Sequence, residues 1–189
     1  MHPILQLAKT ICEDNPQLKN FCQFSTTLKN NYLKPTTTTG SSLLRKSSFK
    51  GNKNTFPMID AIRKYVSKAN WRQTYSISEV GEDFVNRHCY FELIGPNGHF
   101  YHDKVRAFIC YWGEHLKYNW HSHEAEELYY ILGGKALFKT KTKSKVLNAN
   151  ETQFHKSWQS HSMETFEDPL LAFILWRGNG LDQLARIDD

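Results

Sequence analysis

The chain contains the stretch YNWHSHEAEELYYILGG (residues 118–134), in which two histidines and three glutamates fall close together. Along an extended strand, alternate side chains lie on the same face. If this stretch is one strand, a single face carries His121, His123, Glu127 and Tyr129. The alternation then selects Glu127 rather than its neighbour Glu126 as the partner of the two histidines, unless a β-bulge shifts the register.

Two imidazoles and a carboxylate on one face are suited to a divalent first-row metal such as zinc, iron, manganese, nickel or cobalt. A further ligand has to come from another part of the chain, and His161, in QSHSME, lies on a later predicted strand. Without a metal, the buried polar groups would each cost roughly 1–3 kcal/mol, and an unpaired carboxylate would cost more. The sequence therefore predicts one metal ion held by His121, His123, Glu127 and His161.

From about Cys89 onward, short runs rich in aromatic and β-branched residues alternate with turn signals. The runs are CYFELI (89–94), RAFICYWG (106–113), HSHEAEELYYIL (121–132), KALFKTK (135–141) and LLAFILW (170–176). Gly133-Gly134, between two of these runs, is a hairpin signal. Many short strands with no long helix between them favour an antiparallel barrel or jelly roll, so the expected fold class is mainly β.

The N-terminal part of the chain has a residue pattern that predicts helices rather than strands. Apolar residues at helical spacing within residues 3–32, broken at Asn15-Pro16, predict two short helices, and another helix follows Pro57. Residues 34–54 are rich in Thr, Ser, Gly and Lys and predict a long loop or mobile linker. We expect a helical region over residues 1–75 and a β-barrel domain over residues 76–189. The helices would pack on the outside of the barrel or help to form a homodimer.

Composition excludes several classes of protein. The 189 residues carry 24 Lys and Arg against 19 Asp and Glu, a formal net charge of +5. The basic stretches lack the interleaved aromatic residues that binding of single-stranded nucleic acids needs, so no nucleic-acid partner is expected, although a positive field could attract small anions.

The four cysteines form no CxxC pair and are expected to be reduced. No apolar run is long enough to span a membrane and no signal peptide is evident, so we expect a cytoplasmic protein.

The spacing of the HxH pair, three residues, Glu127 and then six residues to Gly134 resembles the first motif of the cupin barrels. A second motif is present only in part: His161 is in place, no Pro-x-Gly precedes it, and Thr165 stands where an Asn is usual. The resemblance implies a cupin (double-stranded β-helix) barrel with N-terminal helices.

A longer ordered set is similar to the cupin-type dimethylsulfoniopropionate (DMSP) lyases: WRQTY (71–75), YWGEHLKYNWHSHEAEELYYILGGKALF (111–138), HKSWQSHSM (155–163) and LLAFILWRGNGL (170–181). This resemblance implies a β-elimination that converts a small zwitterionic sulfonium carboxylate to dimethyl sulfide and acrylate. It implies Tyr129 as the catalytic base and Tyr118 as an assisting or substrate-binding residue. It also implies an apolar wall for the sulfonium group, formed by Trp120, Trp158 and Trp176.

The proposed base raises a chemical question, because the pKa of a free tyrosine is roughly 10. Tyr129 lies two residues from Glu127 on the predicted ligand face, close enough to a bound cation to lose its proton more readily. We therefore hypothesise a metal-assisted phenolate.

Two other functions fit the same pattern. One is another mononuclear metal cupin enzyme, such as an iron dioxygenase, which would consume oxygen and require Fe(II). The other is a non-catalytic cupin that binds a small carboxylate or sugar. A hydroxyl such as that of Tyr129 beside a metal favours a reaction over passive binding.

Overall fold

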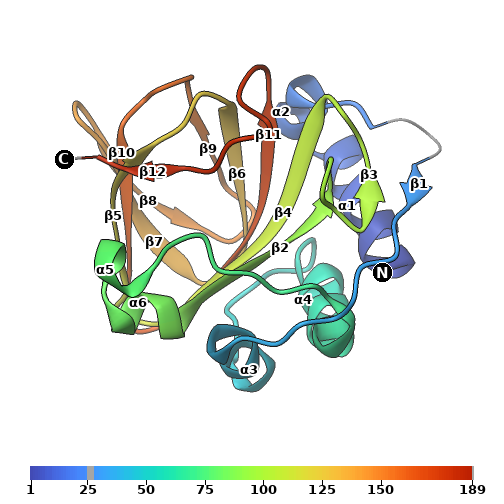
Figure 1. Ribbon diagram of the computed structural model, residues 1–189, viewed down its shortest axis with the longest axis horizontal. Helices are drawn as coiled ribbons and strands as arrows, with labels where there is room; N and C mark the ends of the chain where they lie inside the picture. The colour runs from blue at the N-terminus through green and yellow to red at the C-terminus, as the bar shows by residue number, and fades with distance from the viewer. Residues whose placement is uncertain (25–27, 189) are drawn as a thin grey trace.

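The computed structural model describes residues 1–24 and 28–188 and contains two β-sheets that face each other in a barrel (Figure 1). The larger sheet is ordered β1 (Lys29–Asn30), β3 (Phe100–Tyr101), β2 (His88–Ile94), β4 (Val105–Trp112), β11 (Leu170–Arg177), β6 (Glu126–Gly133) and β9 (Thr152–His155). The smaller sheet is ordered β12 (Arg186–Ile187), β5 (Lys117–Ser122), β10 (His161–Thr165), β7 (Lys135–Thr140) and β8 (Ser144–Asn148). Neighbouring strands are antiparallel except β2 and β3. The predicted mainly β, cupin-type barrel is confirmed.

The central strands of the larger sheet are buried on both faces. In β4, one face belongs to the core beneath the helices, with Val105, Ala107, Ile109 and Tyr111. The opposite face belongs to the barrel interior, with Phe108, Cys110 and Trp112. Strands β6 and β11 alternate in the same way. A strand buried on both faces reads as a continuous apolar run, which explains sequences such as LLAFILW.

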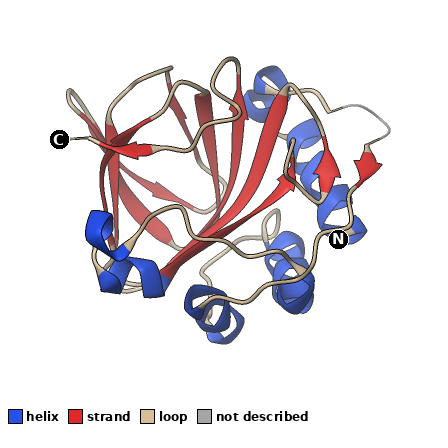
Figure 2. Ribbon diagram, viewed as in Figure 1, coloured by secondary structure: helices blue, strands red, loops and turns tan. Residues whose placement is uncertain are grey.

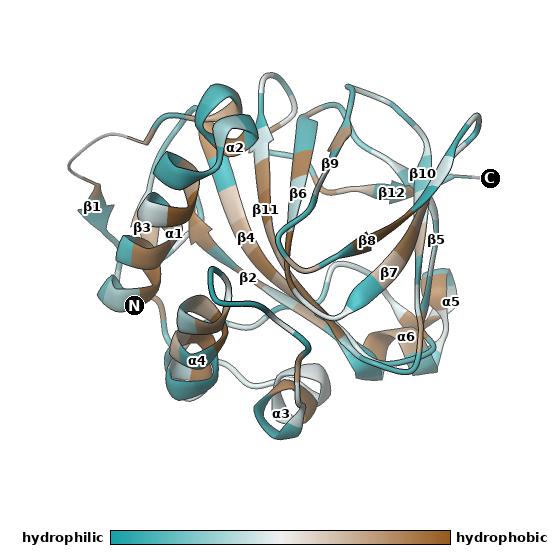
Figure 3. Cartoon of the chain, turned by 180° about the vertical axis from the view of Figure 1, so that it is seen from behind, coloured by the Kyte–Doolittle hydropathy of each residue, from teal (hydrophilic) through white to brown (hydrophobic). Residues whose placement is uncertain are grey.

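Most of the helices cover the outer face of this larger sheet: α1 (His2–Asp14), α2 (Pro16–Phe21), α3 (Thr39–Lys46), α4 (Phe56–Tyr65) and the 3-10 helix η1 (Val66–Lys68) (Figures 2 and 3). Helices α5 (Ile77–Val80) and α6 (Glu82–Arg87) lie instead at one end of the barrel, where Phe84 joins the interior core (Figure 2). The side chain of Asn15 caps α2 by accepting from the backbone N–H groups of Gln17 and Leu18. The predicted pair of short helices and the helix after Pro57 are confirmed.

One apolar core joins the helices to the barrel. It contains Ile4, Leu44 and Ile62 from the helices together with Phe91 and Phe173 from the strands. Helices on the outside of the barrel, one of the two expected arrangements, are therefore present. The division of the chain at residue 75 and the homodimer stay predictions.

The prediction of a long loop or mobile linker over residues 34–54 is wrong, because α3 lies within it. Thr38 and Ser41 form a capping box at its start: the Thr38 hydroxyl accepts from the Ser41 N–H, and the Ser41 hydroxyl accepts from the Thr38 N–H. Leu44 is fully buried against the barrel. Gly40 lies so close to β2 that an added Cβ would be 2.8 Å from the carbonyl oxygen of His88. A cap and a surface to pack on outweigh the polar composition.

The prediction of a hairpin at Gly133-Gly134 is also wrong, since β6 and β7 belong to different sheets. Gly134 has a φ of +82°, and an added Cβ would lie 2.1 Å from the carbonyl oxygen of Pro169. The chain therefore turns here from one wall of the barrel to the other.

The four cysteines are buried and free, as expected of reduced thiols. Among residues 1–24 and 28–188, no helix has both the length and the apolar character needed to cross a bilayer.

A buried histidine makes the stability of the fold depend on pH. The Nδ1–H of His88 donates to the carbonyl of Tyr111 (2.8 Å), yet burial dominates and lowers the pKa of His88 to about 4. Unfolded histidine has a pKa near roughly 6.5. Between these two pH values His88 is protonated in the unfolded chain but stays neutral in the folded chain. Stability is therefore complete above about pH 6.5 and falls toward pH 4, by at most about 1.4 kcal/mol per pH unit from this group.

Urea unfolding at several pH values tests this prediction with His88→Gln, whose amide can still donate a hydrogen bond. The variant should show a shallower loss of unfolding free energy between pH 6.5 and 4 than the wild type. The matched control is His115→Asn at an exposed position with a φ of +49°, which Asn tolerates. Equal slopes for the wild type and His88→Gln would contradict the assignment.

Candidate metal centre

Three buried side chains converge in the barrel interior. They are His123, which follows β5, Glu127 on β6 and His161 on β10, and one ligand atom of each lies within 4.8 Å of the others. The Nε2 atoms of His123 and His161 lie 3.2 Å and 3.1 Å from the same oxygen, Oε2 of Glu127. Because β6 and β10 belong to different sheets, this cluster joins the two walls of the barrel.

The chain reaches this arrangement by a route that differs from the predicted single strand over residues 121–132. Strand β5 ends at Ser122 and β6 begins at Glu126, with a bend between them. The alternation argument holds within β6 alone. There Glu127 is buried in the interior, whereas Glu126 pairs with Arg177 (2.8 Å) away from the cluster. The choice of Glu127 over its neighbour therefore agrees with the geometry.

A β-bulge places two further side chains beside the cluster. His161 lies opposite His121 and Met163 lies opposite Tyr118, so three steps along β5 match two along β10. Tyr118 and His121 consequently share a face, and their rings stack with centroids 3.7 Å apart. The ring of His121 lies 4.0 Å from that of His161. His121 is not one of the three converging groups, and its role as a ligand stays a prediction.

The three histidines are held in the tautomer that a metal needs. Each Nδ1–H donates to a backbone carbonyl: His121 to Asn119 (2.8 Å), His123 to Ala125 (2.8 Å) and His161 to Gln159 (2.7 Å). In the neutral ring Nε2 is then the nitrogen with the lone pair, and in His123 and His161 this atom points at Glu127. The Nε2 of His161 is buried and, despite its 3.1 Å approach to Glu127, makes no hydrogen bond. A divalent cation would satisfy this orphaned nitrogen, so the residues fit a metal.

The pKa of Glu127 depends on its two histidine neighbours. Burial by itself raises this pKa, but the nearby imidazoles of His123 and His161 lower it well below its usual range. Burial lowers the pKa of His121 well below its usual value. Burial opposes the proton on His123, but the charge of Glu127 outweighs it and raises the pKa of His123. A metal binds an ionised carboxylate and neutral imidazoles, so a bound cation would take the place of this proton.

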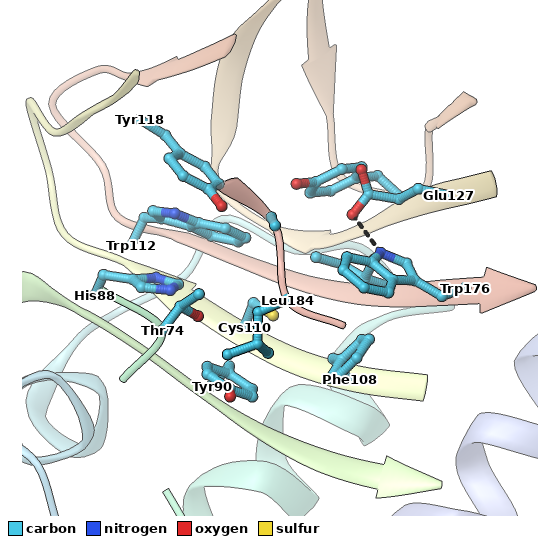
Figure 4. Close-up of a pocket in the computed structure, with 13 residues that line it drawn as sticks. Thr74, His88, Tyr90, Phe108, Cys110, Trp112, Tyr118, Glu127, Trp176 and Leu184 are labelled. Carbon is cyan, nitrogen blue, oxygen red and sulfur yellow. Dashed lines mark hydrogen bonds between the residues drawn. The ribbon is translucent and has the colours of Figure 1, made fainter. Parts of the chain in front are cut away.

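Glu127 of the cluster lies in the wall of an aromatic pocket (Figure 4). The pocket is lined by Thr74, His88, Tyr90, Phe108, Cys110, Trp112, Tyr118, Glu127, Tyr129, Ile174, Trp176, Leu184 and Ala185. The indole N–H of Trp176 donates to Oε1 of Glu127 (2.8 Å), the bond drawn in Figure 4. The Trp176 ring also stacks on His123 with centroids 4.2 Å apart. A small ligand in this space would contact both the cluster and aromatic faces.

Both predicted catalytic tyrosines line this pocket. The hydroxyl of Tyr118 hydrogen-bonds that of Tyr75 (2.7 Å). Tyr129 is 2% exposed and its ring packs edge-on against Phe138, with centroids 5.1 Å apart. Burial, and then the charge of Glu127, raise the pKa of Tyr129 well above its usual value. A phenolate here therefore needs a positive charge close by.

Of the three tryptophans predicted to bind substrate, Trp176 lines the pocket. Trp120 and Trp158 lie elsewhere, and each already has a cation over its ring: the Nζ of Lys141 is 4.1 Å from the Trp120 centroid, and the guanidinium of Arg186 is 4.5 Å from that of Trp158. Trp158 is also 46% exposed. Nothing in the pocket supports extending the substrate-binding proposal to these two.

Sequence reasoning missed several residues of the site. His88 is buried in the pocket wall, where it stacks on Trp112 with centroids 5.0 Å apart. Trp112 could have been found, because strand alternation places it on the same face as Phe108 and Cys110. The ring of His155 stacks on that of His161, with centroids 3.9 Å apart.

Comparison with known proteins gives one family. The family profile described as dimethylsulfoniopropionate lyase matches residues 27–172. The chain is 38% identical over 112 residues to the dimethylsulfoniopropionate lyase DddQ of Ruegeria pomeroyi. That alignment covers 59% of the chain and 56% of the relative, so it spans little more than half the length of this curated protein.

Solved structures agree over nearly the whole chain. A chain from the crystal structures of the DMSP lyases RdDddP and RnDddQII superposes with a TM-score of 0.97 at 33% identity, covering 100% of this chain and 97% of that one. The crystal structure of DddQ from Ruegeria pomeroyi gives a TM-score of 0.93 at 29% identity, covering 97% and 93%. The similarity thus includes the N-terminal helices as well as the barrel.

Proposed function

Because the chain belongs to the dimethylsulfoniopropionate lyase family, we propose that it is a metal-dependent carbon–sulfur lyase that cleaves DMSP to dimethyl sulfide and acrylate. The observation that carries this proposal is the convergence of His123, Glu127 and His161 within 4.8 Å, with Glu127 in the wall of a pocket that Tyr129 also lines. The substrate is a small zwitterion with a carboxylate at one end and a sulfonium at the other.

We propose His123, Glu127 and His161 as metal ligands, with His121 as the fourth. This nitrogen-rich set suits zinc, iron, manganese, nickel or cobalt. When bound, the cation would supply positive charge that stabilises the developing charge on the substrate carboxylate and the phenolate form of Tyr129. Trp176 fixes the carboxylate of Glu127 by donating to its second oxygen.

Side chains of the pocket carry out the remaining steps of the proposed reaction. Tyr129, on the same face of β6 as Glu127, takes the α-proton at its phenolic oxygen. As the C–H bond breaks, its electron pair forms the carbon–carbon double bond, and the C–S pair leaves with sulfur as neutral dimethyl sulfide. Tyr118, with its hydroxyl held by Tyr75, orients the substrate. The indole face of Trp176 accommodates the sulfonium by cation–π attraction.

This function is tested on the purified chain after loading with each candidate metal in turn, by headspace chromatography for dimethyl sulfide, liquid chromatography for acrylate and an oxygen electrode. We expect dimethyl sulfide and acrylate in equal amounts, without oxygen consumption, and no product from His123→Ala. Oxygen uptake with a strict Fe(II) requirement would instead identify the dioxygenase-like alternative. Folded, metal-loaded protein that releases no dimethyl sulfide would refute the proposal.

The tryptophans should differ sharply in their effect on substrate binding. Trp176→Ala removes the aromatic face in the pocket and should raise the KM for DMSP by about 3- to 30-fold, the range expected for a cation–π contact. Trp158→Ala is the matched control, since Arg186 already covers that ring, and should leave KM within about twofold. Steady-state release of dimethyl sulfide measures both. A larger effect from Trp158→Ala would reverse the assignment.

A further inference from the structure

After β11, the chain crosses the open side of the barrel as a strap, which we define as residues 178–188 (Figure 1). Leu184 and Ala185 of the strap line the pocket, and Figure 4 shows Leu184 beside the aromatic side chains. Farther along, β12 pairs with β5 so that Ile187 lies opposite His121. The strap is therefore one wall of the pocket.

The far end of the strap is tied to the segments that carry the candidate ligands. The carboxylate of Asp188 accepts from the hydroxyls of Ser122 (2.6 Å) and Ser160 (2.5 Å). Ser122 lies between His121 and His123, and Ser160 directly precedes His161. The position of the strap is thereby linked to the geometry of the metal centre.

The near end of the strap is held by an arginine far away in sequence. Arg106 on β4 is 3% exposed, and its Nη1 donates to the backbone carbonyls of Leu181 (3.1 Å) and Gln183 (3.0 Å). These two bonds lie just before Leu184 and Ala185. Gly178 and Gly180, with φ of +88° and +69°, provide the turn that brings the strap back over the barrel.

The burial of Arg106 is compensated on its other side. Nη2 donates to Oε2 of Glu92 (2.8 Å), a carboxylate that is itself buried on β2. A buried charge is tolerated when it is paired and hydrogen-bonded in this way. The guanidinium also lies over the rings of Phe108 (4.7 Å) and Trp176 (5.6 Å). Only a planar fork of donors can meet a carboxylate and two carbonyls together while stacking on aromatic rings, so lysine is a poor substitute.

We infer that Arg106 is a positioning residue, which fixes the strap as a pocket wall and supports the indole of Trp176 where it donates to Glu127. Its guanidinium is not among the groups that line the pocket, and it acts through its neighbours. The inference rests on the proposed function only because DMSP is the substrate used to measure turnover. The effect of Arg106 on the position of the strap does not depend on which reaction takes place in the pocket.

The test compares Arg106→Lys with the wild type in two measurements. Lysine keeps the charge beside Glu92 but cannot hold both carbonyls. The KM for DMSP should rise about tenfold, as expected for the loss of a hydrogen bond to a charged group, with metal content unchanged. Trypsin should also cleave faster after Arg177 or Arg186. These two cleavage sites bracket most of the strap, and mass spectrometry of the C-terminal fragments follows their cleavage.

The matched control is Arg87→Lys, which removes a comparable fork: Arg87 binds both oxygens of Asp83 and the carbonyl of Glu114, outside the strap. It should leave KM and strap cleavage unchanged. If Arg106→Lys does not fold, the neutral double variant Glu92→Gln, Arg106→Gln removes the same carbonyl bonds without leaving a buried unpaired charge.

The outcomes separate the two proposals. Faster strap cleavage in Arg106→Lys, with a wild type that does not turn over DMSP, would support the positioning role and refute the lyase. Unchanged cleavage would overturn the positioning role, whether or not KM rises, because Arg106 would then not act through the strap.

Discussion

Glu127→Gln is expected to abolish metal binding and to lower the turnover of DMSP by at least about 1,000-fold. Glu127 is the carboxylate of the converging cluster, and its two oxygens serve His123, His161 and Trp176. The amide is similar in shape but neutral, and its NH₂ group would face a ligand nitrogen or the indole N–H. Losing a Lewis acid costs several kcal/mol of transition-state stabilisation, and each 1.36 kcal/mol is tenfold in rate.

Glu126→Gln is the matched control, because it makes the same chemical change one residue away. Its carboxylate pairs with Arg177 and turns away from the cluster, so activity should stay within about twofold, as expected for a partly exposed pair. Elemental analysis gives the metal content of both variants, and headspace chromatography gives their rates. A Glu127→Gln protein that keeps its ion and its rate would remove the basis of the metal centre.

Tyr129→Phe is expected to retain the metal and to lose about 10²- to 10⁴-fold in kcat, the range for removal of a general acid or base. The substitution deletes one hydroxyl from a side chain that is otherwise fully packed against Phe138. The pocket therefore keeps its shape and KM should change little. Rates of dimethyl sulfide release, measured beside metal content, separate a lost base from a lost ion.

Tyr130→Phe makes the same change on the other face of β6. The Tyr130 hydroxyl donates to Asn150 (2.7 Å) on the helical side of the sheet, away from the pocket. This variant should be close to the wild type in kcat. Near-normal turnover by Tyr129→Phe with the metal bound would exclude the phenolate, and proton abstraction would then have to be assigned to another group.

Local patterns in the sequence predicted the parts of the site that depend on one strand. Glu127 and Tyr129 lie on a single face of β6, so alternation was enough to pair them and to set Glu126 aside. The apolar runs gave the central strands of the larger sheet for the same reason, since burial on both faces leaves a continuous signal.

Features that depend on pairing between distant segments could not be predicted. The bulge that turns Tyr118 and His121 to one face exists because of the register between β5 and β10. The bond from Arg106 to Leu181 joins residues 75 positions apart. Helix α3 was missed because the surface that buries Leu44 is supplied by the sheet and not by the segment itself.

The alternation along β4, β6 and β11 has a consequence for how this protein can change over evolutionary time. Successive residues of these strands belong to two separate cores, so Phe108 shapes the pocket while Ile109, its neighbour, supports the helices. A substitution at a position such as Phe108 alters which ligands the pocket accepts, and one at a position such as Ile109 alters the stability of the fold. Substrate specificity and stability can therefore change independently, one residue at a time, within the same strand.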